Sequence, residues 1–214
     1  MLITHIGHSE FLLETESGYR IVTDPYDASC GYPVREITAD TVLVSHHHHD
    51  HDAVDLLSGD PEVIDYAGIR TVTPDIRLTA IAGCHDDANG AKRGGNLMFI
   101  LETEGLKIAH LGDQGCIPGE EDLEMLKGTD ILMIPVGGFF TIDAKQAREL
   151  VEKICPKVVI PMHYRTACNA DWPIAPVDGY LQLTEGDTEH LTQLRVTAED
   201  IDCLPTTVVL EMAE

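Results

Sequence analysis

The sequence predicts an α/β protein in which short strands outnumber helices. Most apolar residues fall in short runs that are rich in Val, Ile and Leu and that end at Gly, Pro or Asp. Helical periodicity is confined to a few segments, and His or Asp directly follows several of the runs. With 214 residues, of which 43% are hydrophobic, the chain can bury a sizeable core, so we expect a single domain over residues 1–214.

The strands are placed from these runs and from the turns between them. Glu16-Ser17-Gly18 supplies a turn between the second and third runs, and Thr103-Glu104-Gly105 joins two later runs as a hairpin. The runs that we interpret as strands are residues 2–6, 11–14, 19–23, 41–45, 62–65, 69–73, 77–82, 97–101, 106–111, 131–136, 157–161 and 206–212.

Helices are expected in the second half of the chain. Asp143 and Gln146 resemble a capping pair, and the apolar residues of 144–154 fall on one helical face. Residues 120–127 predict a shorter helix. Residues 166–190 are rich in Pro and Gly, so we expect loops there with one short helix.

Composition limits the partners and the location. The chain has 37 acidic residues against 14 Lys and Arg, a formal charge of −23 that repels nucleic acid and anionic membranes. This charge indicates either solubility or a high-salt environment. No apolar run approaches the length of a membrane span and no signal peptide begins the chain, so we expect a cytoplasmic protein with a small-molecule substrate; a homo-oligomer stays open. Six scattered cysteines without C-x-x-C favour neither a zinc knuckle nor a disulfide framework.

A histidine-rich segment, residues 45–52, follows the strand expected at 41–45. We expect a helix over 53–58 after it, with Asp52 as the N-cap. Consecutive histidines can be an expression tag or a loose surface chelator, but tags lie at chain termini and this run is internal. An acidic residue inside the run, directly after a strand, favours an ordered metal site instead.

The spacing within this segment brings metal ligands together. In extended backbone alternate side chains point the same way, so His46 and His48 face one side, opposite to the histidines that follow each of them. Asp50 and His51 can turn toward the same centre where the strand ends. The resulting pattern, H-x-H-x-D-H, combines three imidazoles with a carboxylate, which suits zinc, iron or manganese.

Three further strand ends carry residues of the same kind. His85, Asp113 and His163 each follow a run interpreted as a strand. Loops at one edge of a sheet can bring such residues together from distant parts of the chain. Seven ligands exceed the needs of one tetrahedral ion but suit two, which can lie about 3.5–4 Å apart and share a carboxylate and a water.

These motifs resemble the metallo-β-lactamase superfamily. Within it they are similar to the branch that contains UPF0173-type metal-dependent hydrolases, ascorbate-6-phosphate lactonase and the N-acylphosphatidylethanolamine phospholipase D group. The resemblance spans nearly the whole chain and rests on Gly7-His8-Ser9, Thr23-Asp24-Pro25, H-x-H-x-D-H at 46–51, His85, Leu111-Gly112-Asp113, Pro135-Val136-Gly137-Gly138 and Ile160-Pro161-Met162-His163-Tyr164.

The resemblance implies a four-layer αββα sandwich with two divalent metal ions, zinc above all, with manganese and iron as alternatives. It implies that one ion is held by His46, His48 and His85. A second ion would be held by Asp50, His51 and His163, and Asp113 would bridge the two ions. Asp24 and His8 would lie behind these ligands and orient them. For Asp24, a simple turn cap before Pro25 is an equal alternative.

The expected activity is hydrolysis of a small ester, lactone or phosphodiester. A metal-bridging hydroxide would be the nucleophile, and Asp50 and Asp113 the catalytic carboxylates, with Asp50 also accepting a proton. The alternatives are a metallo-nuclease of the same fold, which the charge of −23 disfavours, and a non-catalytic metal-binding protein.

Three basic residues lie close to the expected ligands in sequence. Lys92 and Arg93 follow His85 in a glycine-rich loop, and Arg165 follows His163. In so acidic a chain an anion needs local positive charge to approach the site, so we expect these residues to bind an anionic substrate group. The alternative is that they pair with the nearby acids Asp86, Asp87 and Asp171.

Overall fold

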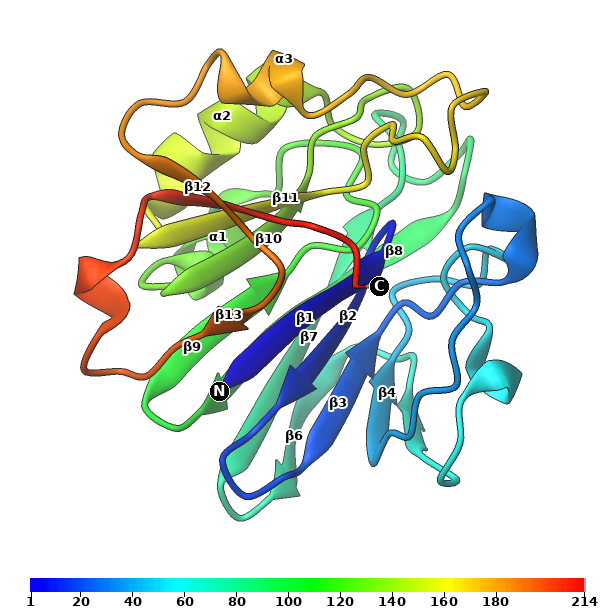
Figure 1. Cartoon of the computed structure of the whole chain (residues 1–214). Coiled ribbons are helices and arrows are strands. Elements are labelled where there is room, and N and C mark those ends of the chain that lie inside the picture. Colours follow the sequence, from blue (N-terminus) through cyan, green and yellow to red (C-terminus); the bar gives the residue numbers. More distant parts are fainter. Residues whose placement is uncertain (214) are drawn as a thin grey trace.

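Two β-sheets packed face to face form the centre of the molecule (Figure 1). The computed structural model describes residues 1–213. The six-stranded sheet has the order β13 (Leu194–Arg195), β1 (Leu2–Gly7), β2 (Glu10–Glu14), β3 (Arg20–Thr23), β4 (Thr41–Leu43) and β5 (Glu62–Ile64). The eight-stranded sheet has the order β12 (Thr188–Leu191), β14 (Thr207–Leu210), β11 (Val158–Met162), β10 (Ile131–Pro135), β9 (Leu106–His110), β8 (Gly95–Thr103), β7 (Ile76–Cys84) and β6 (Gly68–Thr73).

Apolar side chains fill three layers, because successive residues of a strand point to opposite faces. Ile21 and Met133 belong to the core between the sheets. Their neighbours point outward: Val22 packs under the outer layer of the six-stranded sheet, and Leu132 under that of the eight-stranded sheet. Burial on both faces explains why these strands are continuous apolar runs rather than alternating ones.

Helices cover the outer face of the eight-stranded sheet. These are α1 (Glu120–Leu126), α2 (Ala144–Ile154) and α3 (Asp178–Leu181), which share one apolar cluster with β10 and β11. The predicted capping box of α2 is confirmed: Asp143 Oδ1 accepts the Lys145 and Gln146 amides, each at 2.9 Å, and Gln146 Oε1 accepts the Asp143 amide at 3.1 Å.

Loops and 3₁₀ turns cover the outer face of the six-stranded sheet. Its apolar cluster contains Tyr26, Cys30 and Tyr32, which lie in and around the turn Ala28–Cys30. The α/β sandwich is confirmed, with a fourth layer in which the described chain has 3₁₀ turns in place of α-helices.

The prediction of a helix over residues 53–58 is wrong. The chain forms only the 3₁₀ turn Val54–Leu56, with Ala53 at its N-cap position and no side-chain cap. Asp52 does not cap it, because its carboxylate faces the His47 ring instead, with Oδ2 3.4 Å from Nδ1. The sequence also gave no sign of β12 and β13, which are short and largely exposed.

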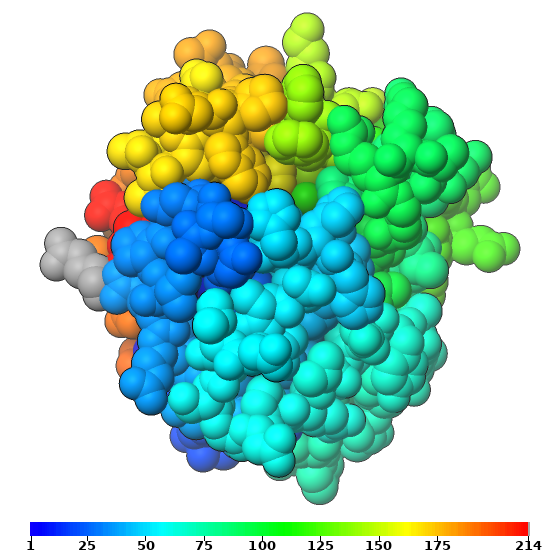
Figure 2. Space-filling view, turned by 90° about the vertical axis from the view of Figure 1, so that its right-hand side faces the viewer, coloured from blue at the N-terminus to red at the C-terminus, as the bar shows by residue number. Residues whose placement is uncertain are grey.

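Strand direction brings the candidate ligands to one end of the sandwich. In the six-stranded sheet, β1, β3 and β4 run the same way, because β2 is antiparallel to both β1 and β3. In the eight-stranded sheet, β7, β9 and β11 likewise share a direction. The carboxyl ends of these strands lead into segments that meet around a hollow on one face (Figure 2). Among residues 1–213, no helix has the length and apolarity needed to cross a bilayer.

Candidate metal centre

The histidine-rich segment lies in bends and a turn after β4, not in the extended backbone expected from the sequence, and His48 is exposed although its donor atom groups with those of His46 and His85. His46, Asp50 and His51 are buried, and His51 is completely inaccessible. The side chains of His47 and His49 are 66% and 60% exposed. The chain turns at the end of this segment with a hydrogen bond from the His51 amide to the His48 carbonyl, at 2.9 Å. That turn directs His51 back toward His46, with ring centroids 4.3 Å apart.

The structure brings all seven predicted ligand residues together, with His8 in addition. In each of three groups, the donor atoms lie within 4.8 Å of one another. The groups are His46, His48 and His85; His8, Asp50, His51 and His163; and His46, His51 and Asp113. No cysteine of the described chain joins them, and all six thiols are free.

Asp113 lies between the first two of these groups. Its Oδ2 is 3.3 Å from His85 Nε2, on one side, and 3.1 Å from His163 Nε2, on the other. Its Oδ1 is 3.3 Å from His51 Nε2. The Asp113 amide donates to Asn96 Oδ1 at 2.8 Å, which fixes the tight turn after β9. A single carboxylate therefore contacts both groups of imidazoles, as a bridging ligand must.

These separations fit shared metal ions. Two donors held about 2.1 Å from one tetrahedral ion lie roughly 3.4 Å apart, and the Asp113 contacts match that spacing. His46 Nε2 and His8 Nδ1 are buried with no hydrogen-bond partner among the described residues. Buried polar atoms are almost always satisfied, so their position supports the view that metal ions complete this site.

The electrostatics also suit cations. Burial, with the charge of His51, lowers the pKa of His46 to about 3, and burial, with the charge of His163, lowers that of His8 to about 4. Burial opposes ionisation of Asp113, but the charges of His163 and His51 prevail and hold its pKa well below the usual range. Neutral imidazoles and an ionised carboxylate are the forms that bind metals, so His46, His8 and Asp113 already have the required form. His51 differs: burial lowers its pKa, but Asp113 and Asp24 prevail and raise it well above the usual value, so a metal ion would have to displace its proton.

Asp24 contacts one of the candidate ligand imidazoles. Its Oδ1 accepts the Ser45 amide at 2.7 Å, and its Oδ2 accepts the Ser45 hydroxyl at 2.8 Å. The same Oδ2 lies 3.0 Å from His51 Nδ1, which leaves Nε2 of that ring directed at Asp113. Asp24 is fully buried with φ 41°. Its contact with a ligand supports the orienting interpretation over a simple turn cap.

His8 lies among the candidate ligands rather than behind them. It follows β1 with φ 53°, a conformation that non-glycine residues rarely adopt. Its Nε2 is 3.4 Å from Asp50 Oδ2, and its ring centroid is 4.2 Å from that of His163. Gly7 is required beside it, because a Cβ there would lie 2.9 Å from the Tyr32 ring. The sequence signal was the Gly-His-Ser motif at a strand end.

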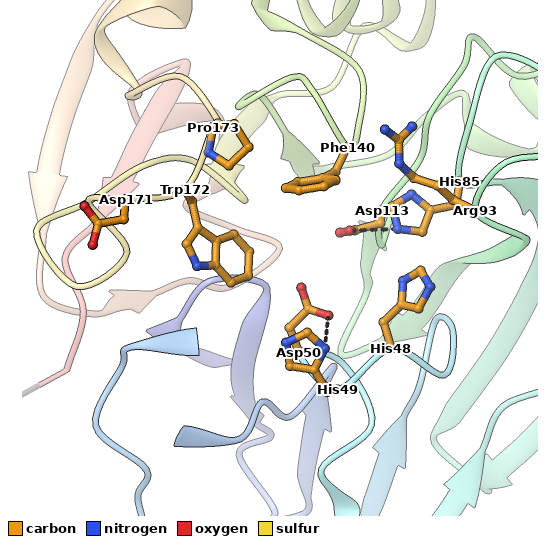
Figure 3. A pocket seen from close by; sticks show the side chains of 10 residues that line it. All are labelled: His48, His49, Asp50, His85, Arg93, Asp113, Phe140, Asp171, Trp172 and Pro173. Atoms are coloured by element: carbon orange, nitrogen blue, oxygen red, sulfur yellow. Dashed lines mark ion pairs between the residues drawn. The ribbon is translucent and has the colours of Figure 1, made fainter. Parts of the chain in front are cut away.

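A cavity of about 460 Å³ opens above the ligands (Figure 3). Its lining combines metal-ligand candidates with residues that the sequence did not single out: His48, His49, Asp50, His85, Arg93, Asp113, Phe140, Asp171, Trp172 and Pro173. The aromatic residues and the proline come from loops after β10 and β11. No spacing rule identified them, because their role depends on how those loops fold over the site.

The three predicted anion-binding residues have different surroundings. Arg93 lines the cavity, and its guanidinium carbon lies 5.5 Å from the Phe140 ring centroid. Lys92 Nζ pairs with Asp87 Oδ1 at 2.6 Å, the alternative raised from the sequence. Arg165 is exposed and is not among the residues that line this cavity.

Comparison with known proteins identifies metal-dependent hydrolases as relatives of this chain. A model of the β-lactamase superfamily domain matches residues 2–163. UPF0173 metal-dependent hydrolases of Thermococcus onnurineus and Carboxydothermus hydrogenoformans are 30% and 31% identical over 204 and 206 residues, covering 82% and 83% of this chain and 88% of each relative. The structure of a candidate Zn-dependent hydrolase of the metallo-β-lactamase superfamily from Thermotoga maritima is similar, with 35% identity, a TM-score of 0.78 and coverage of 98% of this chain and 97% of that one.

The relatives are described as metal-dependent hydrolases, which agrees with the donor cluster at the strand ends of this chain. The match covers most of the chain, and these relatives are aligned over most of their own length. The chain belongs to the metallo-β-lactamase superfamily and, within it, to the UPF0173 metal-dependent hydrolases.

Proposed function

We propose that this protein is a dinuclear hydrolase that cleaves a small anionic ester, lactone or phosphodiester. The observation that carries the proposal is the position of Asp113, whose carboxylate contacts His85 on one side and His51 and His163 on the other. One ion would be held by His46, His48 and His85. The second would be held by Asp50, His51 and His163, with His8 close enough to contribute.

When bound, two such ions supply a hydroxide nucleophile near neutral pH and polarise the bond to be cleaved. The protein residues position the reactants. Asp113 fixes the spacing of the two imidazole groups, and Asp24 holds His51 in one orientation. Asp50 lines the cavity, so its carboxylate can accept the proton released as water adds to the substrate.

The cavity sets the substrate's size and charge. A volume of about 460 Å³ falls in the range for small-molecule sites. Arg93 at its edge favours an anionic substrate, with Lys92 and Arg165 as further candidates on neighbouring loops. Zinc is the ion that we expect first for a histidine-rich site, with manganese and iron as alternatives, and a cytoplasmic location stays a prediction.

The test is a panel of esters, lactones, thioesters and phosphodiesters, assayed with protein loaded with zinc, manganese or iron. We expect turnover of at least one oxygen-ester class, and its loss in Asp113→Ala. The His47→Ala variant serves as a control, because that ring points away from the ligands. Full metal loading without turnover of any class would instead indicate a metal-binding protein without hydrolase activity.

A further inference from the structure

The cavity has an apolar wall opposite the metal-ligand candidates. Phe140, Trp172 and Pro173 form this wall, and Figure 3 shows the two rings facing Asp50 and His85 across the open space. The ring centroids of Phe140 and Trp172 are 6.2 Å apart with an interplanar angle of 77°, so the two rings make a corner. Such a corner presents one ring face and one ring edge to a ligand, which suits a flat apolar group.

The backbone holds Phe140 in place at a conformational cost. The Phe140 amide donates to the Gly138 carbonyl at 2.8 Å, which closes a three-residue turn around Phe139. Phe139 has φ 63°, although bulky residues rarely adopt positive φ. The Ile142 amide donates to the Gln114 carbonyl at 2.9 Å, which ties this loop to the residue after Asp113. Strain of this kind is concentrated at functional sites, where the surrounding structure maintains it.

Trp172 is fixed by a separate loop. Its amide donates to the Asn169 carbonyl at 2.9 Å, and the buried Asn169 side chain accepts the Thr166 amide at 2.7 Å. The indole ring packs edge-on against His8, with centroids 5.2 Å apart. The wall therefore contacts the candidate ligands directly, so a group that rests on it also lies close to the reacting atoms.

Arg93 adds positive charge at one end of the wall. Its loop is held by Asp86, whose carboxylate accepts four backbone amides, at 2.7 to 3.0 Å, including that of Arg93 itself. The guanidinium lies near the Phe140 ring and has no carboxylate within 4.0 Å among the described residues. The acidic side chain of Asp171 lies at the opposite end, beyond Trp172 (Figure 3). The cavity is thus polarised along its length.

We propose that this cavity selects substrates in which a flat apolar group, such as an aromatic ring, bears an anionic substituent. The ring packs into the corner of Phe140 and Trp172, and the anion binds Arg93, which places the bond to be cleaved over Asp113. This inference names the substrate class of the proposed hydrolase and rests on that function. In the reaction, water adds across an ester bond and releases the acid and the alcohol.

Binding can be tested without turnover, because Trp172 is the single tryptophan of the chain. Its fluorescence in the metal-loaded protein is titrated with benzenesulfonate, benzyl alcohol and methanesulfonate, which are aromatic and anionic, aromatic and neutral, and anionic without a ring. Sulfonates and alcohols are used because they compete weakly for metal ions. We expect benzenesulfonate to bind roughly tenfold more tightly than either of the others.

Two variants test separately whether Arg93 binds the anionic group and whether Phe140 binds the aromatic ring. Arg93→Gln should remove the advantage of benzenesulfonate over benzyl alcohol, and Phe140→Ala should weaken both aromatic ligands. Arg77→Gln and Tyr66→Ala are matched controls, since Arg77 pairs with Glu102 and Tyr66 stacks on Arg70, and neither lines the cavity. Equal binding of all three ligands, or an Arg93→Gln variant that behaves as wild type, would overturn the proposal.

A parallel assay separates this proposal from the proposed function. The kcat/KM values for 4-carboxyphenyl acetate, phenyl acetate and methyl acetate are compared as ratios of variant to wild type, which cancels the intrinsic reactivity of each ester. We expect Arg93→Gln to lower only the first and Phe140→Ala to lower the first two. Selective ligand binding without turnover would count against the hydrolase, whereas turnover without these preferences would count against the subsite.

Discussion

The two halves of the donor cluster differ in how the fold encloses them. The open half consists of His46, His48 and His85; His48 and His85 line the cavity, and His48 is exposed. The enclosed half, His8, Asp50, His51 and His163, is buried apart from a partly accessible Asp50 side chain. One half offers three donors, two of which line the cavity, and the other offers four donors, of which only Asp50 reaches the cavity.

This difference suggests that the two halves have different functions, one in retaining a metal ion and the other in receiving the substrate. Catalytic metal sites keep an open position for water or substrate, whereas sites with four protein donors are typically structural. The open half resembles a catalytic metal site, and the enclosed half resembles a structural one. We therefore expect the enclosed half to retain its ion more firmly, and the open half to exchange its ion with solvent and to receive the substrate.

The largest effect should follow from Asp113→Ala, because this carboxylate contacts both halves. Its loss leaves several imidazoles without the negative charge between them. We expect kcat/KM to fall by roughly a thousandfold and the affinity for both ions to decrease. Metal analysis by mass spectrometry and steady-state kinetics provide the measurements. A variant that loses only one ion would show that Asp113 belongs to a single half.

Asp24→Asn should affect the enclosed half more than the open half, which Asp24 reaches only through Ser45, whose hydroxyl oxygen lies 2.9 Å from His46 Nδ1. The carboxylate holds Ser45 and the His51 ring, so its neutralisation frees His51 to rotate and weakens its donation to metal. We expect the affinity for the second ion to fall 10- to 100-fold. Competition with a chelator of known affinity measures this loss, and thermal unfolding checks that the fold persists. Equal weakening of both ions would mean that the halves are not independent.

His8→Gln should have a smaller effect on the same half. If His8 contributes a donor beside Asp50, its replacement lowers the affinity for the second ion by roughly tenfold and leaves the first unchanged. Cobalt substitution adds a spectroscopic test, since the visible absorption reports the number of ligands. An unchanged cobalt spectrum in His8→Gln would place this ring outside the coordination sphere.

The smallest effect should come from His47→Ala, and His49→Ala should likewise spare metal binding, although His49 lines the cavity. Both side chains are mostly exposed, and His47 faces Asp52 and Asp65 rather than the ligands. We expect metal content to be unchanged and kcat/KM of His47→Ala to stay within about twofold of wild type. A loss in His47→Ala comparable to that of Asp113→Ala would mean that the assignment of inward and outward side chains is wrong.

The sequence predicted the open half more completely than the enclosed one. The grouping of His46 with His48 agrees with the expectation from their spacing, although both lie in bends after the strand has ended at Leu43, and the capping box at Asp143 follows from a local pattern. The contact of His8 with Asp50 depends instead on two sheets packing together, which no local pattern encodes. The same holds for the apolar wall of Phe140 and Trp172.

One local expectation is wrong. Asp52 resembles an N-cap in sequence, yet its carboxylate faces His47, and the following residues form a single 3₁₀ turn. A side-chain partner here competes with the role that sequence position favours. Anion binding by Lys92 stays a prediction, although its ammonium group pairs with Asp87 on the surface.

Timed metal release tests the inequality of the two halves most directly. The protein loaded with zinc is mixed with excess EDTA, and samples separated from the chelator at intervals are analysed for bound zinc. We predict two ions per chain that leave in two phases, and the faster phase should be absent in His48→Ala. A single bound ion, or two ions that leave together in wild type and variant alike, would contradict the division into an open and an enclosed half.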